Sequence, residues 1–365
     1  MSDKRFPKIA EEQMRALLEP PSGAVRIVID TDAKNEIDDQ FTLAWALLSQ
    51  DVLHIEGVYA APYSFQYRVE EMRRAYAAQS APDSASDEDR VLLSRYGEQI
   101  ARLAAQGKTP DDISMVAPDV GMEESYQEIL VVYDKMNANA DGVVFRGSPG
   151  YLTSLDDPIR SPAAEHLVER ALAGSSDDPL YIVAIGAATN IASALLLAPE
   201  IIDRIVVTWT AGYPTTVKQP NYSFNLEQDM LASQLLFDSG VPHVYLPGFH
   251  IGAQLRLSLP EMETWVRGKG AIGDYLYWLY THNPHYAFQG IDDHFGRTWI
   301  IWDLINIAWL LNPNWVPSDL VRAPRLGDDK RWHHDRADAH LMREAYGIDR
   351  DAIFRDFFTK LEQAP

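Results

Sequence analysis

The feature that most constrains the fold is a run of β-branched residues that ends in acids and leads into an apolar helix. Residues 25–30 read Val-Arg-Ile-Val-Ile-Asp and follow a Pro-Pro-Ser-Gly breaker, which predicts a buried strand. Helical periodicity follows over residues 40–49, then a strand over 54–61 and a helix over 68–79. This alternation predicts a mostly parallel β-sheet with right-handed crossover connections.

The same alternation returns later in the chain. Strands are predicted over 142–146, 180–185, 204–210 and 243–246, and helices over 162–173, 190–197, 227–239 and 303–311. We therefore expect a single α/β domain over residues 25–322, with a mostly parallel central β-sheet flanked by helices. Residues 1–24 are expected to form an N-terminal extension, and residues at about 80–120 a helical insertion. Residues 323–365 are expected to form a C-terminal helical tail that packs on the domain.

Composition excludes several classes of function. The 365 residues include 32 Lys and Arg against 53 Asp and Glu, for a formal net charge of -21, which disfavours binding to the phosphate backbone of a nucleic acid. The chain has no Cys, so only oxygen and imidazole donors remain for a metal. No long uncharged apolar segment and no signal-like N-terminus is found, so we expect no membrane partner and a cytoplasmic location.

The most informative residues are five acids between the first strand and the first helix: Asp30, Asp32, Glu36, Asp38 and Asp39. They fall at the carboxyl edge of the predicted sheet, where ligands bind in α/β folds. Crowded carboxylates repel one another unless a cation joins them, and oxygen ligands suit Ca²⁺ or Mg²⁺. Two alternatives stay open. One is a solvated acidic loop in which Asp38 caps the helix, and the other is an aspartyl-nucleophile phosphatase that uses Asp30.

Asp30-Thr-Asp32 and Asp38-Asp39 resemble the opening motif of the inosine/uridine-preferring nucleoside hydrolase family. Four later segments resemble that family in the same order, at residues 184–192, 206–212, 222–229 and 301–313. The resemblance spans residues 25–313. It implies a nucleoside hydrolase-like fold, a small-molecule nucleoside or ribosyl substrate, a role in purine or pyrimidine salvage, and a homo-oligomer, either a dimer or a tetramer.

The resemblance also implies a metal site. Asp32, Asp39 and Asp303 would supply carboxylates to one Ca²⁺, together with the backbone carbonyl of Ile185. Asp32 would act as the general base on a water held by the metal, while the N-glycosidic bond stretches toward an oxocarbenium-like state. Ca²⁺ suits this arrangement because its high, flexible coordination accommodates ribose hydroxyls and water together.

Substrate contacts are implied in the same way. Asp30 and Asp38 would support the metal ligands and the ribose hydroxyls, and Asn225 would hydrogen-bond to the ribose. A non-catalytic module that binds ribose or a nucleoside remains an alternative to the hydrolase.

The chain departs from the family pattern at three places. The turn between Asp32 and Asp38 is two residues longer and lacks the Pro-Gly of the family, so Asn35 and Glu36 are expected to enter the site or to replace part of it. Ser223 stands in place of a Glu, which removes a contact to the 5′ side of the sugar. Trp302 stands in place of a His that protonates the departing base. Among the Tyr and His residues that precede Trp302, His294 is our candidate for a substitute acid.

Overall fold

The computed structural model describes residues 5–113, 115–285 and 293–365. Within these residues the main sheet has eight strands in the order β3-β2-β1-β4-β5-β6-β12-β9. Neighbouring strands are parallel except for β12 and β9, which are antiparallel. The strands are β1 Val25–Thr31, β2 Leu53–Ala60, β3 Val144–Arg146, β4 Leu180–Ala184, β5 Ile205–Ala211, β6 His243–Pro247, β9 Ser318–Arg322 and β12 Leu341–Ala345. The predicted fold class is confirmed.

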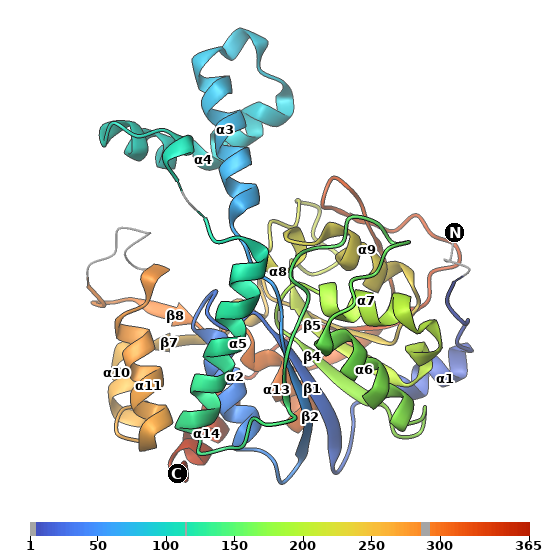
Figure 1. The fold of residues 1–365 in the computed structure, drawn as a ribbon. Coiled ribbons are helices and arrows are strands. Elements are labelled where there is room, and N and C mark those ends of the chain that lie inside the picture. Colours follow the sequence, from blue (N-terminus) through green and yellow to red (C-terminus); the bar gives the residue numbers. More distant parts are fainter. Residues whose placement is uncertain (1–4, 114, 286–292) are drawn as a thin grey trace.

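Helices cover both faces of this sheet (Figure 1). One face carries α6 Pro162–Ala173, α7 Thr189–Leu197 and α9 Met230–Asp238. The other carries α2 Asp38–Leu47, α5 Pro118–Lys135, α11 Gly270–Thr281, α13 Leu304–Leu311 and α14 Arg350–Leu361. Shorter or peripheral elements are α1 Glu11–Leu17, α3 Gln66–Ser80, α4 Asp87–Ala105, α8 Phe224–Glu227, α10 Leu259–Glu261, β7 Arg256–Ser258, β8 Thr298–Ile300, β10 Arg325–Leu326 and β11 Trp332–His333.

The alternation of side chains along β1 assigns its residues to two different cores. Ile27 and Ile29 belong to the cluster under α2 and α13, whereas Val28 belongs to the cluster under α6 and α7. Successive strand residues point to opposite faces, so Asp30 shares the face of Val28 and Thr31 shares the face of Ile29. Asp30, inside β1, therefore points to the face covered by α6 and α7, away from α2 and α13.

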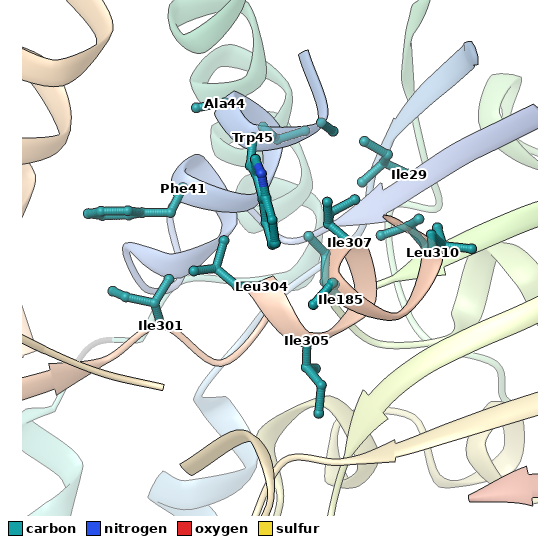
Figure 2. Packing of buried hydrophobic residues seen from close by; sticks show 14 of the residues in the cluster. Ile29, Phe41, Ala44, Trp45, Ile185, Ile301, Leu304, Ile305, Ile307 and Leu310 are labelled. Carbon is teal, nitrogen blue, oxygen red and sulfur yellow. The ribbon is translucent and has the colours of Figure 1, made fainter. Parts of the chain in front are cut away.

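Helices α2 and α13 pack against each other over the carboxyl ends of β1 and β4 (Figure 2). Phe41 and Trp45 of α2 and Leu304 and Ile307 of α13 are fully buried in one cluster with Ile29. Truncating one such Leu or Phe side chain to Ala typically costs about 2–5 kcal/mol of stability. The two helices are therefore rigidly placed, with both N-termini at the same edge of the sheet.

Two segments differ from the expected organisation. The expected insertion projects from the body as α4, together with the preceding helix α3, whereas α5 lies along the body (Figure 1). Ile129 and Val132 of α5 belong to the core cluster on this face of the sheet. The tail is not only helical, because β12 lies inside the main sheet between β6 and β9. Strand pairing at residues 341–345 thus extends the sheet beyond residue 322. Within the described residues, no helix is both long and apolar enough to cross a bilayer.

Candidate active site

Four aspartates from three chain segments meet at the carboxyl edge of the sheet. Asp32 follows β1, Asp38 and Asp39 begin α2, and Asp303 immediately precedes α13. One carboxylate oxygen from each of Asp38, Asp39 and Asp303 lies within 4.8 Å of the others. Asp32 lines the same cavity, and all four side chains are buried. Residues from opposite ends of the chain thus form one acidic cluster.

Burial and mutual repulsion raise the pKa of every carboxyl group in this cluster. For Asp39, burial is the largest cause, followed by the charges of Asp32 and Asp38. For Asp303, burial is again first, followed by Asp38 and Asp39. In the part of the chain that the structure describes, none of the four forms an ion pair with Lys or Arg. Carboxylates crowded in this way require protons or a cation, and carboxylate oxygens fit a hard divalent cation.

Local structure partly offsets this repulsion. The N-termini of α2 and α13 carry the positive ends of their helix dipoles, and the aspartates sit at those ends. The Thr31 hydroxyl donates a hydrogen bond of 2.5 Å to Asp39. Gly186, after β4, lets Asp32 approach, because a Cβ there would lie 3.1 Å from the Asp32 carboxylate carbon. The two helix N-termini, the Thr31 hydroxyl and the small Gly186 therefore allow the acids to pack closely.

The aspartates form part of the wall of a cavity of about 180 Å³. Polar groups from loops after the other strands complete it, together with aromatic side chains. The remaining lining residues are Asn35, Glu36, Arg68, Ile185, Thr210, Ala211, Gly212, Tyr222, Ser223, Phe224, Asn225, Gly248, Phe249 and Trp302. A polar cavity with one acidic wall and one aromatic wall suits a ligand that has a hydroxylated part and a flat part.

A family model for inosine-uridine preferring nucleoside hydrolases matches residues 91–354. The chain belongs to this family. The matched range begins after β1 and α2, so it does not include Asp32, Asp38 and Asp39. That Asp38 and Asp39 lie beside Asp303 is an observation from the structure.

Individual relatives agree with this assignment. The chain is 26% identical over 182 residues to the pyrimidine-specific ribonucleoside hydrolase RihB of Escherichia coli, an alignment that covers 46% of this chain and 55% of that protein. The chain therefore spans about half the length of this curated relative. The fold is similar to a purine-preferring ribonucleoside hydrolase from Gardnerella vaginalis, with a TM-score of 0.61, 19% identity, and coverage of 93% of this chain and 98% of that one. An inosine-guanosine nucleoside hydrolase gives a TM-score of 0.62 at 14% identity, with 93% and 99% covered.

The longer turn after Asp32 is held by contacts that the family pattern does not predict. Lys34 adopts a φ of 103°, a conformation that favours glycine, and its ammonium lies 3.0 Å from Glu128 of α5. The backbone oxygen of Asn35 accepts a 2.7 Å hydrogen bond from Nε2 of His285. These contacts fix the turn so that Asn35 and Glu36 line the cavity, as expected.

Ser223 and Asn225 both line the cavity at the start of α8. The Asn225 amide donates hydrogen bonds to the backbone oxygens of Ile185, at 3.2 Å, and Thr210, at 3.0 Å. It thereby joins the ends of β4 and β5, and it lies beside the carbonyl expected to bind the metal. Ser223 is buried and leaves this part of the wall without a carboxylate.

Trp302, in place of the family His, also lines the cavity. Its ring is half-buried and meets Phe249 edge-on, with the ring centroids 5.9 Å apart. The two rings therefore contribute two nearly perpendicular apolar surfaces to the cavity wall that Asp303 also lines.

Two of the expected site residues lie away from the cavity. Asp30 is fully buried on the opposite face of β1, where it accepts a 2.8 Å hydrogen bond from Asn190 of α7. His294 is not among the lining residues, and its ring centroid lies 5.7 Å from that of Tyr280. The neighbouring residues 286–292 lie outside the described residues.

Burial raises the pKa of Asp30 to about 7, because only the hydrogen bond from Asn190 opposes the loss of solvation. Between the unfolded pKa of about 4 and this value, the folded chain binds the additional proton, so stability falls as pH rises. We expect Asp30→Asn to equal wild type near pH 4 and to exceed it by roughly 2–4 kcal/mol above pH 7. Urea unfolding in a chelator from pH 4 to 8 measures this difference, and a difference independent of pH would contradict it.

Several lining residues were not singled out by sequence reasoning: Arg68, Tyr222, Phe224, Gly248 and Phe249. Tyr222 and Phe224 lie inside the expected segment 222–229, but no role was assigned to them. Gly248 and Phe249 follow β6, beyond the expected motifs. Arg68 comes from α3, and nothing in the local sequence points it toward the acids.

Proposed function

We propose that this protein hydrolyses the N-glycosidic bond of a ribonucleoside or related N-riboside, with Ca²⁺ as its cofactor. The observation that carries the proposal is the meeting of Asp38, Asp39 and Asp303 within 4.8 Å at the cavity, in a member of the nucleoside hydrolase family. The relatives named above are ribonucleoside hydrolases of differing base preference, so the base is left open.

The donors fit a hard divalent cation. Asp39 and Asp303, whose carboxylate oxygens lie within 4.8 Å of each other and of Asp38, would hold it. Asp32 and the carbonyl of Ile185, which line the same cavity, would join them, and Asp38 would bind the cation or a ribose hydroxyl. When bound, Ca²⁺ neutralises the buried carboxylates and orients water and sugar hydroxyls. It is favoured over Mg²⁺ because several carboxylates plus sugar hydroxyls exceed octahedral coordination.

In this proposal Asp32 is the general base. It removes a proton from water as the water oxygen bonds to the anomeric carbon of the ribose, and the C–N bond breaks with its electron pair moving to the base nitrogen. The departing base takes up a proton, so the products are ribose and the free base. Asn225 and Asp38 would hold the ribose hydroxyls during this step.

Trp302 is proposed to stack on the departing base, because an indole has no proton to give at neutral pH. We expect Trp302→His to keep the metal and to change the ratio of kcat/KM between purine and pyrimidine nucleosides by about 10-fold. The control is Trp265→His, at an exposed site outside the cavity. An unchanged ratio would show that Trp302, although it lines the cavity, does not contact the base.

The phosphatase alternative is disfavoured by the position of Asp30, which faces α7 and does not line the cavity. The decisive experiment is a screen of ribonucleosides for release of reducing sugar, with and without chelator and with added Ca²⁺. Release that is lost with chelator and restored by Ca²⁺ supports the proposal. Binding without release would support a non-catalytic module, and release of phosphate from esters alone would support a phosphatase.

A further inference from the structure

Arg68 is a half-buried cation in the wall of the same cavity. It lies near the start of α3, and its guanidinium sits over the rings of Phe65, at 4.8 Å, and Phe224, at 5.4 Å. Those two rings stack on each other with centroids 4.5 Å apart. Nε donates to the Tyr67 hydroxyl at 3.1 Å, so the side chain is held in place by rings and one hydrogen bond.

The terminal nitrogens of Arg68 have no acceptor within the described residues, and no carboxylate oxygen lies within 4.0 Å of them. Two neighbouring cations, Arg95 and Lys330, differ from Arg68 because each forms ion pairs with carboxylates. Arg95 and Lys330 lie over the ring of Tyr222, and both pair with Glu71 and Glu227. Among the described residues, carboxylates thus neutralise Arg95 and Lys330 beside the cavity but not Arg68 in its wall.

The simplest internal role for Arg68 would be as the counter-ion of Glu36, whose Oε2 is buried without a hydrogen bond. The charge of Arg68 does lower the pKa of Glu36, but burial outweighs it and raises that pKa to about 7. A guanidinium committed to one carboxylate normally closes onto it through two N–H groups. Within the described residues Arg68 makes no such pair, and it lines the cavity together with Ser223.

We propose that the natural substrate carries an anionic group, a phosphate or a carboxylate, and that Arg68 binds it. This inference rests on the proposed hydrolase function and names its substrate class. A planar guanidinium with free terminal N–H groups, stacked on aromatic rings, is suited to bidentate binding of either oxyanion. The acids would hold the ribose at one wall, and Arg68 would receive the anion at another.

Two matched substrate pairs separate the possible sources of the anion. Uridine 5′-monophosphate is compared with uridine for a phosphate on the sugar, and 5-carboxyuridine with its neutral 5-carboxamide for a carboxylate on the base. We expect wild type to prefer the anionic member of one pair in kcat/KM by about 10- to 100-fold. Arg68→Gln should reduce that preference by the same factor, and Arg68→Lys should restore part of it.

Arg73→Gln is the matched control, because Arg73 lies on the same helix but is exposed and pairs with Glu70 and Asp111. It should leave the preference unchanged. A thermal melt of each variant confirms that it is folded. If Arg68→Gln slows both members of each pair equally, or if no anionic substrate is preferred, Arg68 only balances internal charge and the inference is overturned.

Calorimetry makes the test independent of turnover. With Ca²⁺ present, the anionic ligand should bind wild type more tightly than its neutral partner, and Arg68→Gln should remove the difference. Hydrolysis of neutral nucleosides without any anion preference would overturn this inference alone. Anion-selective binding with no release of base from any compound would overturn the proposed hydrolysis while supporting the role of Arg68.

Discussion

Replacing Asp32 by Asn is expected to lower kcat by about 10²–10⁴-fold while leaving the Kd for nucleoside within a few-fold of wild type. A general base acts on water only as the reaction proceeds, so its removal affects the transition state far more than the bound substrate. Asn keeps the size of the side chain and one oxygen for the cation. Single-turnover kinetics and calorimetric titration of the same preparation give the two quantities.

The matched control is Asp51→Asn, the same substitution at an exposed position beyond α2. It should leave both kcat and Kd unchanged. If Asp32→Asn instead raises KM with kcat retained, Asp32 binds the substrate and a different group removes the proton.

Replacing Asp39 or Asp303 by Ala is expected to weaken Ca²⁺ binding more than about 100-fold, because loss of groups that only support metal ligands already costs 10- to 100-fold. The order of the melting temperatures of wild type and variant should then depend on Ca²⁺: wild type should melt higher with Ca²⁺, and the variant should melt at or above wild type in chelator. With Ca²⁺ at 100 times its Kd, wild type gains about 2.7 kcal/mol that the variants lack. In chelator the variants should melt at or above wild type, because one charge has left a buried, repelling cluster.

Calcium titration followed by tryptophan fluorescence, and thermal melts in both conditions, measure these effects. Retention of full calcium affinity by Asp39→Ala would overturn the proposed metal site. A variant that melts below wild type by the same amount with and without Ca²⁺ would indicate a packing role for that aspartate.

The first part of the site could be predicted because local and global signals agree there. Apart from the half-buried Arg26, Val25 to Ile29 form a β-branched run that is buried on both faces, and the acids follow it directly. The alternation of strands and helices then fixes which edge of the sheet holds them. Asp303 is too distant in sequence for such reasoning, and only the resemblance to a family pointed to it.

Strand β12 shows why other parts could not be predicted. Its sequence, Leu-Met-Arg-Glu-Ala, consists entirely of good helix formers, so local propensity gives no sign of a strand there. The sheet overrides this preference because β12 fills the space between β6 and β9. Its two charges are buried but satisfied: Arg343 donates to the backbone oxygens of Leu18 and Ser318, and Glu344 accepts from Thr215. These partners come from remote segments, so no local pattern shows them.

The position of β12 also sets an order for synthesis and folding. β9 precedes β12 in the chain, and in the described part of the sheet it pairs with β12 alone, while β6 has β5 on one side and β12 on the other. Until residues 341–345 leave the ribosome, β6 presents an open edge of backbone donors and acceptors, and β9 has no strand to join. Open edges of this kind template intermolecular pairing. A nascent or prematurely terminated chain that ends before Leu341 would therefore be prone to aggregation, even though every residue of the acidic cluster had already been made.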